Sequence, residues 1–402
     1  MVGCTAGNND DADTLVVWDP FANLGETPEE QAAYEDFVAE VDAGFAETHP
    51  GVTIKHSRFG YDGYTTKLAA AVAANKAPDI AWDYTDINWK FTDPIDDLLT
   101  GATKDDLTLT EQSIVSAKDG KLHILPFGTY QGVWLYNKAL FEQAGIEPPT
   151  TQEEWLENCD TLNEAGITPT KVSFNGPYKL DRYVALYATQ FMPDIAEWNN
   201  QSLAFDGSEY SKGLDALMEG LDHACFGSNP ESTGIAGDTS NQFRAGTAAM
   251  MFNAGSIRVE SLEADIGVGN VGVMLQPALE GGKENMDASL QMGLTLVKTS
   301  KNKDLAWEYM EYFVQPENQA LAWDMIRQTP NSKSAAATSD DPVYAQLLEW
   351  GKDPQFQVGA WPVNPEESFE YAKMAPAVVA GNLSTDEFLT SMQAVREKTK
   401  SK

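Results

Sequence analysis

Aromatic rings stand beside carboxylate and amide side chains at four places in the first third of the chain. A Trp or Tyr ring can cover the apolar C–H face of a pyranose, and neighbouring Asp, Asn or Gln side chains can exchange hydrogen bonds with its hydroxyls. This combination of residue types indicates sugar-binding chemistry. The four clusters are Trp18 with Asp19 and Asn23, Tyr61 with Tyr64, Trp82 with Asp83, Tyr84, Asp86 and Trp89, and Tyr130 with Gln131.

Strand-like and helix-like segments alternate around these clusters. Apolar runs at 14–18, 52–59 and 78–84 predict strands. Thr27-Pro28 predicts the start of a capped, amphipathic helix that ends before His49, and an alanine-rich helix is expected over 64–75. This alternation predicts a largely parallel sheet flanked by helices. Ligands bind beyond the carboxyl ends of such strands, where the clusters lie, although Trp18 fits a core position equally well.

A segment at 125–145 has the pattern of a crossover between two lobes. An apolar strand is expected to break at Pro126, to carry Tyr130 and Gln131 across a gap, and to resume as a second strand. A helix then follows and ends at Gly145. This stretch resembles the lobe-crossing segment of the extracellular solute-binding proteins that serve ABC sugar importers, the family that includes maltose-binding protein.

Further segments resemble the same family in the same order. Residues 241–256 match its most recognisable signature, a short helix, a glycine stop, a strand of small residues and methionine, and a glycine-led turn, although Ile257 stands where the family often has a tryptophan. Glycine lets backbone N–H groups approach a ligand closely. In the second lobe the resemblance implies ligand contacts from Asn175, Tyr178, Asp181, Asn253, Gly255 and Ser256, with Gln291, Met292 and Trp361 as weaker candidates. A core or surface role stays open for Trp361.

The resemblance covers nearly the whole chain and implies an α/β, two-lobe periplasmic-binding-protein fold. Each lobe would be a largely parallel sheet flanked by helices, and a hinge of two or three segments would join them. Residues 1–12 would form a lipoprotein-type tether. Residues 13–125 and 278–330 would form lobe one, and residues 126–277 and 331–402 would form lobe two.

The function implied by the resemblance is capture of an oligosaccharide in the cleft between the lobes, followed by delivery to the permease of an ABC importer. The protein would be a monomer without catalytic activity at the extracellular face of a bacterial cytoplasmic membrane. Two alternatives stay open. With 61 carboxylates a glycosidase pair can always be drawn, since only spatial separation identifies one, so an exported carbohydrate-active enzyme is possible on sequence grounds. The other alternative is a binding protein for a peptide or another small solute.

The composition separates this chain from several classes of protein. Its 402 residues, 42% of them apolar, are enough for a sizeable core and for two or three domains. The formal net charge is −34, with 61 acidic and 27 basic side chains. Nucleic-acid binders concentrate positive charge against the phosphate backbone, so nucleic acid is not expected as a partner.

The three cysteines suggest two different roles. Val2-Gly3-Cys4-Thr5, followed by a polar stretch, looks like the end of a bacterial lipoprotein signal in which Cys4 would carry the lipid; an ordinary cysteine in a leader is the alternative. A lipid on Cys4 would tether the protein to the membrane surface. Cys159 and Cys225 could form a disulfide or remain two separate buried thiols, and the sequence leaves this choice open.

Cofactor, metal and catalytic motifs are weak or absent in the sequence. Residues 267–272 fit the glycine pattern of dinucleotide-binding loops, but a strand rather than a helix is expected after them, so we interpret them as a turn. The four histidines show no spacing typical of metal ligands. No nucleophile-elbow or phosphate-loop motif occurs. We therefore expect no cofactor, no metal and no catalytic residue.

Overall fold

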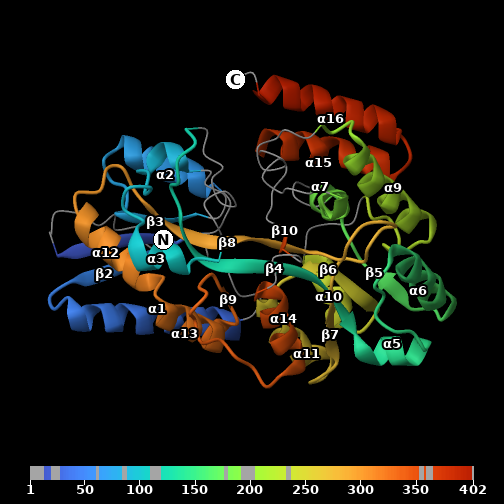
Figure 1. Ribbon diagram of the computed structural model, residues 1–402, viewed down its shortest axis with the longest axis horizontal. Helices are drawn as coiled ribbons and strands as arrows, with labels where there is room; N and C mark the ends of the chain where they lie inside the picture. The colour runs from blue at the N-terminus through green and yellow to red at the C-terminus, as the bar shows by residue number, and fades with distance from the viewer. Residues whose placement is uncertain are drawn as a thin grey trace, which may run out of the picture. The chain divides into compact units, whose positions relative to one another are not determined.

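The computed structural model of the protein (Figure 1) describes residues 13–19, 28–59, 63–83, 88–108, 119–175, 180–191, 204–231, 237–352, 357–358 and 365–400. At 237–239, 253, 289–292, 357–358, 365–366 and 400 it describes the backbone alone. The chain divides into two compact units. Unit 1 comprises Met1–Tyr130 and Leu290–Thr338, and unit 2 comprises Gln131–Ser289 and Ser339–Lys402.

Unit 1 is built on a mixed sheet. Strand β1 lies between β2 and β3 and runs parallel to both, whereas β8 runs antiparallel to β3, and β9 antiparallel to β4. The sheet is therefore less uniformly parallel than the alternation of segments predicts. The elements are β1 (Thr14–Asp19), α1 (Pro28–Thr48), β2 (Thr53–Arg58), α2 (Tyr64–Ala73), β3 (Ile80–Asp83), η1 (Trp89–Phe91), α3 (Gly101–Asp106), the first half of β4 (Leu125–Asn137), the second half of β8 (Met286–Leu296), α12 (Lys303–Phe313), α13 (Pro316–Ile326) and β9 (Thr329–Pro330).

Helices cover both faces of this sheet, with α1 and α13 on one side of β1 to β3 and α2 on the other (Figure 1). Side chains alternate between the two faces of a strand. Accordingly Leu15 and Val17 join the main core with α1, α12 and α13, and Trp18 packs with Leu68 of α2 on the opposite face. The same alternation determines which of the predicted site residues are buried in the core.

Unit 2 combines short strands with a larger set of helices. Here β4 pairs antiparallel with β6 and with β7, β5 runs parallel to β6, and β10 runs parallel to β8. The elements, besides the remaining halves of β4 and β8, are α5 (Lys138–Ala144), α6 (Gln152–Glu164), β5 (Thr168–Thr170), α7 (Leu180–Ala188), η2 (Thr189–Phe191), α9 (Ser208–Asp222), α10 (Gly237–Arg244), β6 (Ala248–Ala254), η3 (Ser256–Arg258), α11 (Val259–Ile266), β7 (Val271–Met274), α14 (Pro342–Lys352), β10 (Gln357–Val358), α15 (Pro365–Val379) and α16 (Thr385–Lys400).

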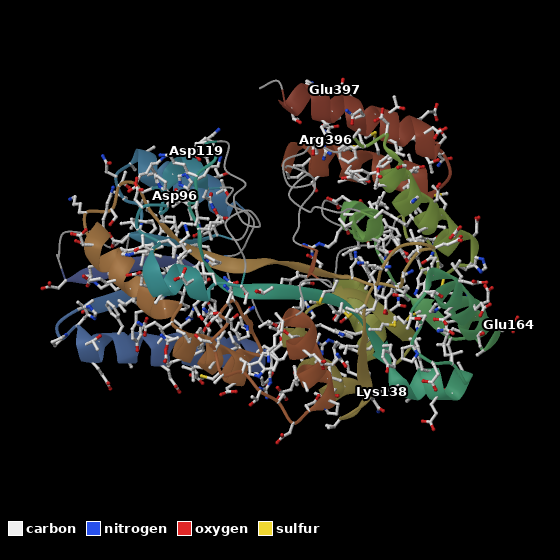
Figure 2. All side chains as sticks on the ribbon, viewed as in Figure 1. Asp96, Asp119, Lys138, Glu164, Arg396 and Glu397 are labelled. Carbon is white, nitrogen blue, oxygen red and sulfur yellow. A yellow bond between two sulfur atoms is a disulfide. The ribbon has the colours of Figure 1, made fainter. Side chains whose placement is uncertain are left out.

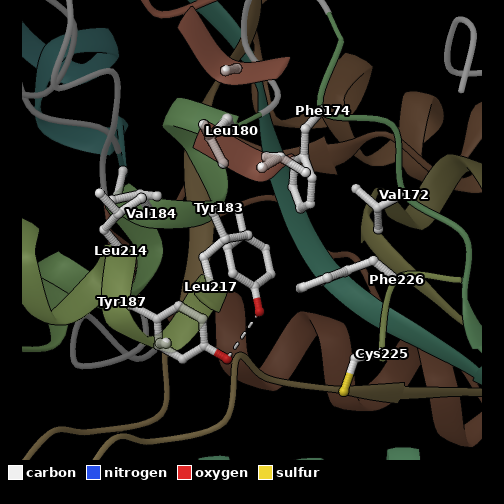
Figure 3. Close-up of a cluster of buried hydrophobic side chains, with 14 of the residues drawn as sticks. Val172, Phe174, Leu180, Tyr183, Val184, Tyr187, Leu214, Leu217, Cys225 and Phe226 are labelled. Carbon is white, nitrogen blue, oxygen red and sulfur yellow. Dashed lines mark hydrogen bonds between the residues drawn. The ribbon is translucent and has the colours of Figure 1, made fainter. Parts of the chain in front are cut away.

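The core of unit 2 is rich in aromatic side chains. Figure 3 shows Tyr183 and Tyr187 of α7 among the buried neighbours Leu214, Leu217 and Phe226. The Tyr183 hydroxyl donates to the Tyr187 hydroxyl at 3.5 Å. A disulfide joins Cys159 of α6 to Cys225, and both cysteines are fully buried. The structure thus decides between the two alternatives that the sequence left open for this pair.

Two of the three connections between the units run through unbroken strands, β4 and β8, and the third lies outside any strand, after Thr338. β4 is one continuous strand of 13 residues, so the expected break at Pro126 is wrong. Proline is tolerated at the start of a strand because only its own missing N–H is lost from the ladder. The boundaries between the units fall after Tyr130, Ser289 and Thr338, whereas the sequence analysis expected them after residues 125, 277 and 330.

Several local predictions are confirmed. Helix α1 covers 28–48, in agreement with the start expected at Pro28 and the end expected before His49. Helix α5 ends at Gly145, whose φ of 72° suits glycine. Gly267 and Gly269, with φ of 101° and 79°, form the turn that leads into β7, as the interpretation of residues 267–272 requires. Within the described ranges, no helix is long and apolar enough to cross a bilayer.

Candidate ligand-binding residues

An aromatic cluster lies where β1 and β2 end in unit 1. The Trp18 and Phe59 rings lie 4.8 Å apart between centroids, and Phe59 and Tyr64 lie 6.3 Å apart. The Tyr64 hydroxyl donates to the Trp18 carbonyl oxygen at 3.0 Å, and the Lys67 ammonium lies 3.9 Å above the Phe59 ring. Trp18 and Phe59 are half-buried, so part of their surface is open. The arrangement is a fixed aromatic surface of the kind that packs against a sugar ring.

Phe59 is a residue that the sequence analysis missed. It is the first residue after β2, and its backbone N–H donates to the Asp19 carbonyl oxygen at 2.7 Å. This bond holds the end of β2 beside the end of β1. Its place at the carboxyl end of the predicted strand 52–59, two residues before Tyr61, could have indicated it.

Asp83 lies at the carboxyl end of β3, in the same part of unit 1. It is 1% exposed, and its Oδ2 accepts a hydrogen bond from the Asn88 backbone N–H at 3.0 Å. Burial raises the pKa of the Tyr64 phenol well above its usual value, and the negative charges of Asp83 and Asp19 add to that shift. Tyr64 therefore remains a hydrogen-bond donor at any physiological pH.

Trp89 begins η1 and is half-buried beside His123, with 6.3 Å between the ring centroids. His123 is fully buried and is held on both sides, by the Thr92 hydroxyl at 3.1 Å and by Asp119 Oδ2 at 3.0 Å. Figure 2 labels Asp119 on unit 1. Some burial opposes ionisation of Asp119, but hydrogen bonds from His123 and from the Lys121 N–H hold its pKa below the usual value. These contacts fix the segment that carries Trp89.

Two predicted site residues belong to the core of unit 1. Trp82 is 1% exposed and packs edge-on against Phe127 and Phe313, with centroid distances of 5.8 and 5.2 Å. Asp19 is also 1% exposed, and its Oδ2 accepts a hydrogen bond from the Tyr34 hydroxyl at 3.0 Å. Strand alternation places Asp19 on the face of Leu15 and Val17, toward α1. Their contacts give both side chains structural roles.

The predicted pair at the crossover is divided between the units. Tyr130 is the last residue of unit 1 and is half-buried. Gln131 is the first residue of unit 2, is 1% exposed, and donates from Nε2 to the Leu347 carbonyl oxygen of α14 at 2.9 Å. Gln131 therefore anchors α14 to β4.

Asp181 lies in the first turn of α7 in unit 2 and is 3% exposed. Its Oδ2 accepts a hydrogen bond from the Ser368 hydroxyl of α15 at 2.8 Å. Burial raises the pKa of the Asp181 carboxyl, although the Ser368 bond and the Arg182 charge oppose that shift. Arg182 pairs with Asp287 of β8 at 3.0 Å. These contacts fix the start of α7, which lies five residues after the exposed Asn175.

A buried ion pair lies next to this bond in unit 2. Arg396 of α16, labelled in Figure 2, donates to both carboxylate oxygens of Glu367 of α15, at 3.1 and 3.0 Å. The Arg396 guanidinium also covers the Phe205 ring at 4.0 Å. Both charges are almost completely buried, and a two-pronged geometry is the one that compensates their loss of water. The pair is structural, and it fixes α15 against α16.

Gly255 and Ser256, at the start of η3 in unit 2, are both buried. The φ of Gly255 is −84°, which any residue can adopt, so the backbone conformation does not require the glycine predicted from the signature. Asn253 lies in β6, and Gln291 and Met292 lie in β8, where the structure describes the backbone alone. The remaining predicted residues, Cys4, Asn23, Tyr61, Tyr84, Asp86, Tyr178 and Trp361, lie outside the described residues.

Within the described ranges, no group of three or more His, Cys, Asp or Glu side chains is placed so that it could bind a metal ion. The histidines of those ranges instead pair singly with carboxylates. His49 pairs with Glu308, His56 with Asp42, His123 with Asp119 and His223 with Asp160, at 2.9 to 3.1 Å.

Comparison with known proteins gives a family model and several relatives. The model described as bacterial extracellular solute-binding protein matches residues 25–320. A Brucella abortus (strain 2308) protein, described as a candidate binding protein, is 24% identical over 294 residues, which are 70% of this chain and 69% of that protein. The melibiose/raffinose/stachyose-binding protein of Bacillus subtilis (strain 168) is 22% identical over 181 residues, which are 44% of this chain and 42% of that protein.

Solved structures resemble the chain over almost its full length. A chitin oligosaccharide binding protein superposes with a TM-score of 0.78 and 18% identity, and the match covers 97% of this chain and 99% of that one. At this level of identity the likeness establishes the fold, which is the two-lobe α/β architecture expected from the sequence.

Proposed function

Because the chain belongs to the bacterial extracellular solute-binding protein family, we propose that it captures an oligosaccharide outside the cell and delivers it to the permease of an ABC importer. The observation that carries this proposal is the cluster in unit 1, where the half-buried Trp18 and Phe59 rings lie beside Tyr64. Rings that open partly to solvent next to fixed hydrogen-bonding groups suit a pyranose. The sugars named for the Bacillus subtilis relative and for the chitin oligosaccharide binding protein support the same class of ligand.

The proposed contacts in unit 1 come from side chains that are half-buried or lie at strand ends. The rings of Trp18, Trp89 and Tyr130 would pack against sugar faces, with Phe59 added to them. Asp83 and Tyr64 would hold the turns that carry these rings and would pair with hydroxyls near them. Asn23, Tyr61, Tyr84 and Asp86 remain proposed contacts from the sequence resemblance.

In unit 2 the proposed contacts are Asn175 and Ser256, with Asp181 fixing the start of α7 behind Asn175. Asn253, Gly255, Gln291, Met292, Tyr178 and Trp361 remain proposals from the resemblance. We further propose that both lobes bind the same ligand and close on it, because a ligand that contacts the second lobe only in a closed form stabilises that form. Small-angle scattering should then show a smaller radius of gyration when the ligand is added; an unchanged radius contradicts closure.

The experiment for the main proposal is calorimetry with a panel of neutral oligosaccharides. Raffinose, stachyose, maltotriose, xylotetraose and a chitin trimer sample the linkages that such a site could accept. We expect one class to bind with a dissociation constant in the micromolar range or below, typical of such sites. Failure of every sugar, with a peptide mixture as the comparison, would redirect the proposal to a non-sugar solute.

Three further properties belong to the same proposal. Incubation of the protein with the bound sugar should leave the sugar intact, since we propose binding without catalysis; shorter products would indicate an enzyme. Mass spectrometry of the protein from membranes should find a lipid on Cys4. Gel filtration with light scattering should give the mass of one chain, because we propose a monomer.

A further inference from the structure

We propose that Asn88 is a further ligand-contacting residue and that its side-chain amide forms hydrogen bonds with two adjacent hydroxyls of the bound sugar. This inference rests on the proposed function. It adds to unit 1 a polar residue that the sequence analysis did not select.

The first observation is an unused hydrogen-bonding atom. Asn88 is 1% exposed, and its Oδ1 is buried without a hydrogen-bond partner. Buried polar side-chain atoms in proteins nearly always have partners, and an unpaired one lowers stability. An asparagine that keeps such an atom therefore calls for a compensating role.

The second observation removes the ordinary explanation for an asparagine at this position. Asn88 is the N-cap residue of η1 (Trp89–Phe91), where asparagine is favoured because its side chain can accept a backbone N–H. Its side chain makes no such capping bond. The main chain alone forms the turn, since the Asn88 N–H donates to Asp83 Oδ2 at 3.0 Å and its carbonyl accepts from the Phe91 N–H at 2.8 Å. The η1 turn thus forms without a hydrogen bond to the Asn88 side-chain oxygen.

The third observation is the position of the residue. Asn88 is tied directly to Asp83 at the carboxyl end of β3, and it precedes the half-buried Trp89. Strand ends of α/β sheets are where ligands bind. A primary amide offers an acceptor and a donor side by side, so one hydroxyl can donate to Oδ1 while its neighbour accepts from Nδ2. A pyranose carries such neighbouring hydroxyls, and Trp89 supplies a ring for its C–H face.

The test is the variant Asn88→Leu, which keeps the approximate shape and removes both polar atoms. Its affinity is measured by calorimetry with the panel sugar that binds the wild-type protein most tightly. Loss of two hydrogen bonds to neutral groups predicts roughly tenfold weaker binding or more. The melting temperature of the ligand-free variant should be unchanged or higher, because an unpaired buried atom has been removed.

The matched control is Asn318→Leu, also in unit 1. The Asn318 amide is buried and donates to the Tyr312 carbonyl oxygen at 2.7 Å, so its loss should lower the melting temperature and leave the affinity unchanged. If Asn88→Leu does not fold, Asn88→Ala serves for the affinity measurement.

Unchanged affinity in the Asn88 variants overturns the inference. A lower melting temperature together with unchanged affinity identifies a structural water on the amide and overturns it as well. A wild-type protein that binds none of the panel sugars contradicts the proposed function itself, and this inference falls with it.

Discussion

The Ser368 hydroxyl donates a hydrogen bond of 2.8 Å to Asp181 Oδ2 and so joins α15 to the first turn of α7 within unit 2. Both residues are buried. The two helices meet here although almost half of the chain separates them in sequence. The bond gives a partner to a carboxylate that burial would otherwise leave without water.

Ser368→Ala should destabilise the protein. The substitution leaves Asp181 Oδ2 buried without this donor, which costs about 1–3 kcal/mol in the free energy of unfolding. Urea unfolding followed by circular dichroism measures the change. Ser368→Thr keeps the hydroxyl and is the control, with a smaller expected loss. Equal stability of the Ala variant and the wild-type protein would show that the bond contributes nothing.

Asp181→Asn should change how stability depends on pH. Burial raises the folded-state pKa of Asp181 above its ordinary value of 3.8, so between these two values the folded protein binds more protons than the unfolded chain. The ionised Asp181 carboxylate therefore destabilises the folded protein. This destabilisation is absent below pH 3.8 and grows as the pH rises through the raised pKa. We expect the Asn variant to be more stable than the wild-type protein at pH 7 and the difference in stability to disappear near pH 3.8. Melting curves recorded between pH 3.5 and 8 measure this difference.

Asp119→Asn is the control for these pH-dependent melting curves, because its expected effect on stability has the opposite sign. Hydrogen bonds from His123 and the Lys121 N–H lower the pKa of Asp119 despite some burial, so its contribution is present above pH 3.8 and is lost as the pH falls through the lowered value. This variant should be the less stable protein at pH 7. If the difference in stability between either variant and the wild-type protein does not depend on pH, the pKa shift given for that carboxyl group is contradicted.

Trp18→Ala and Trp82→Ala should separate binding from folding. Trp82 fills the core of unit 1, so its truncation should cost about 3–5 kcal/mol of stability. Trp18 is half-buried, so its truncation should cost less stability and, if its ring contacts the ligand as proposed, weaken sugar binding by roughly tenfold or more. Thermal melting and calorimetry on the folded variants measure both quantities. The reverse pattern would exchange the roles of the two residues.

Removal of the Cys159–Cys225 disulfide should destabilise the protein strongly. The bridge spans a sequence separation of 66 residues, and the chain-entropy model gives about 4 kcal/mol for a loop of that length. Denaturant unfolding of the double variant Cys159→Ala, Cys225→Ala measures the loss. Cys4→Ala is the control and should unfold like the wild-type protein. A reductant should destabilise the wild-type protein and leave the double variant unaffected, so equal sensitivity of the two would contradict the bridge.

Sequence patterns sufficed for elements that are specified by neighbouring residues. The start of α1 at Pro28, the end of α5 at Gly145 and the glycine turn before β7 all depend on a few consecutive positions, and each lies where it was predicted. The α/β class followed from the alternation of such elements. The family resemblance added the two-lobe architecture, which the comparisons support.

The face to which each side chain turns depended on tertiary structure. Trp82 and Asp83 are adjacent in one apolar strand, yet the pairing of β3 with β1 and β8 sends the Trp82 ring into the core and leaves Asp83 at the turn with Asn88. Phe59 entered the aromatic cluster only because β2 pairs beside β1. Cys159 and Cys225 meet through the packing of unit 2. A sequence pattern specifies structure over only a few neighbouring residues. Which side chains are buried, and which residues they contact, depends on strand register and helix packing between distant segments, so only the folded chain could decide them.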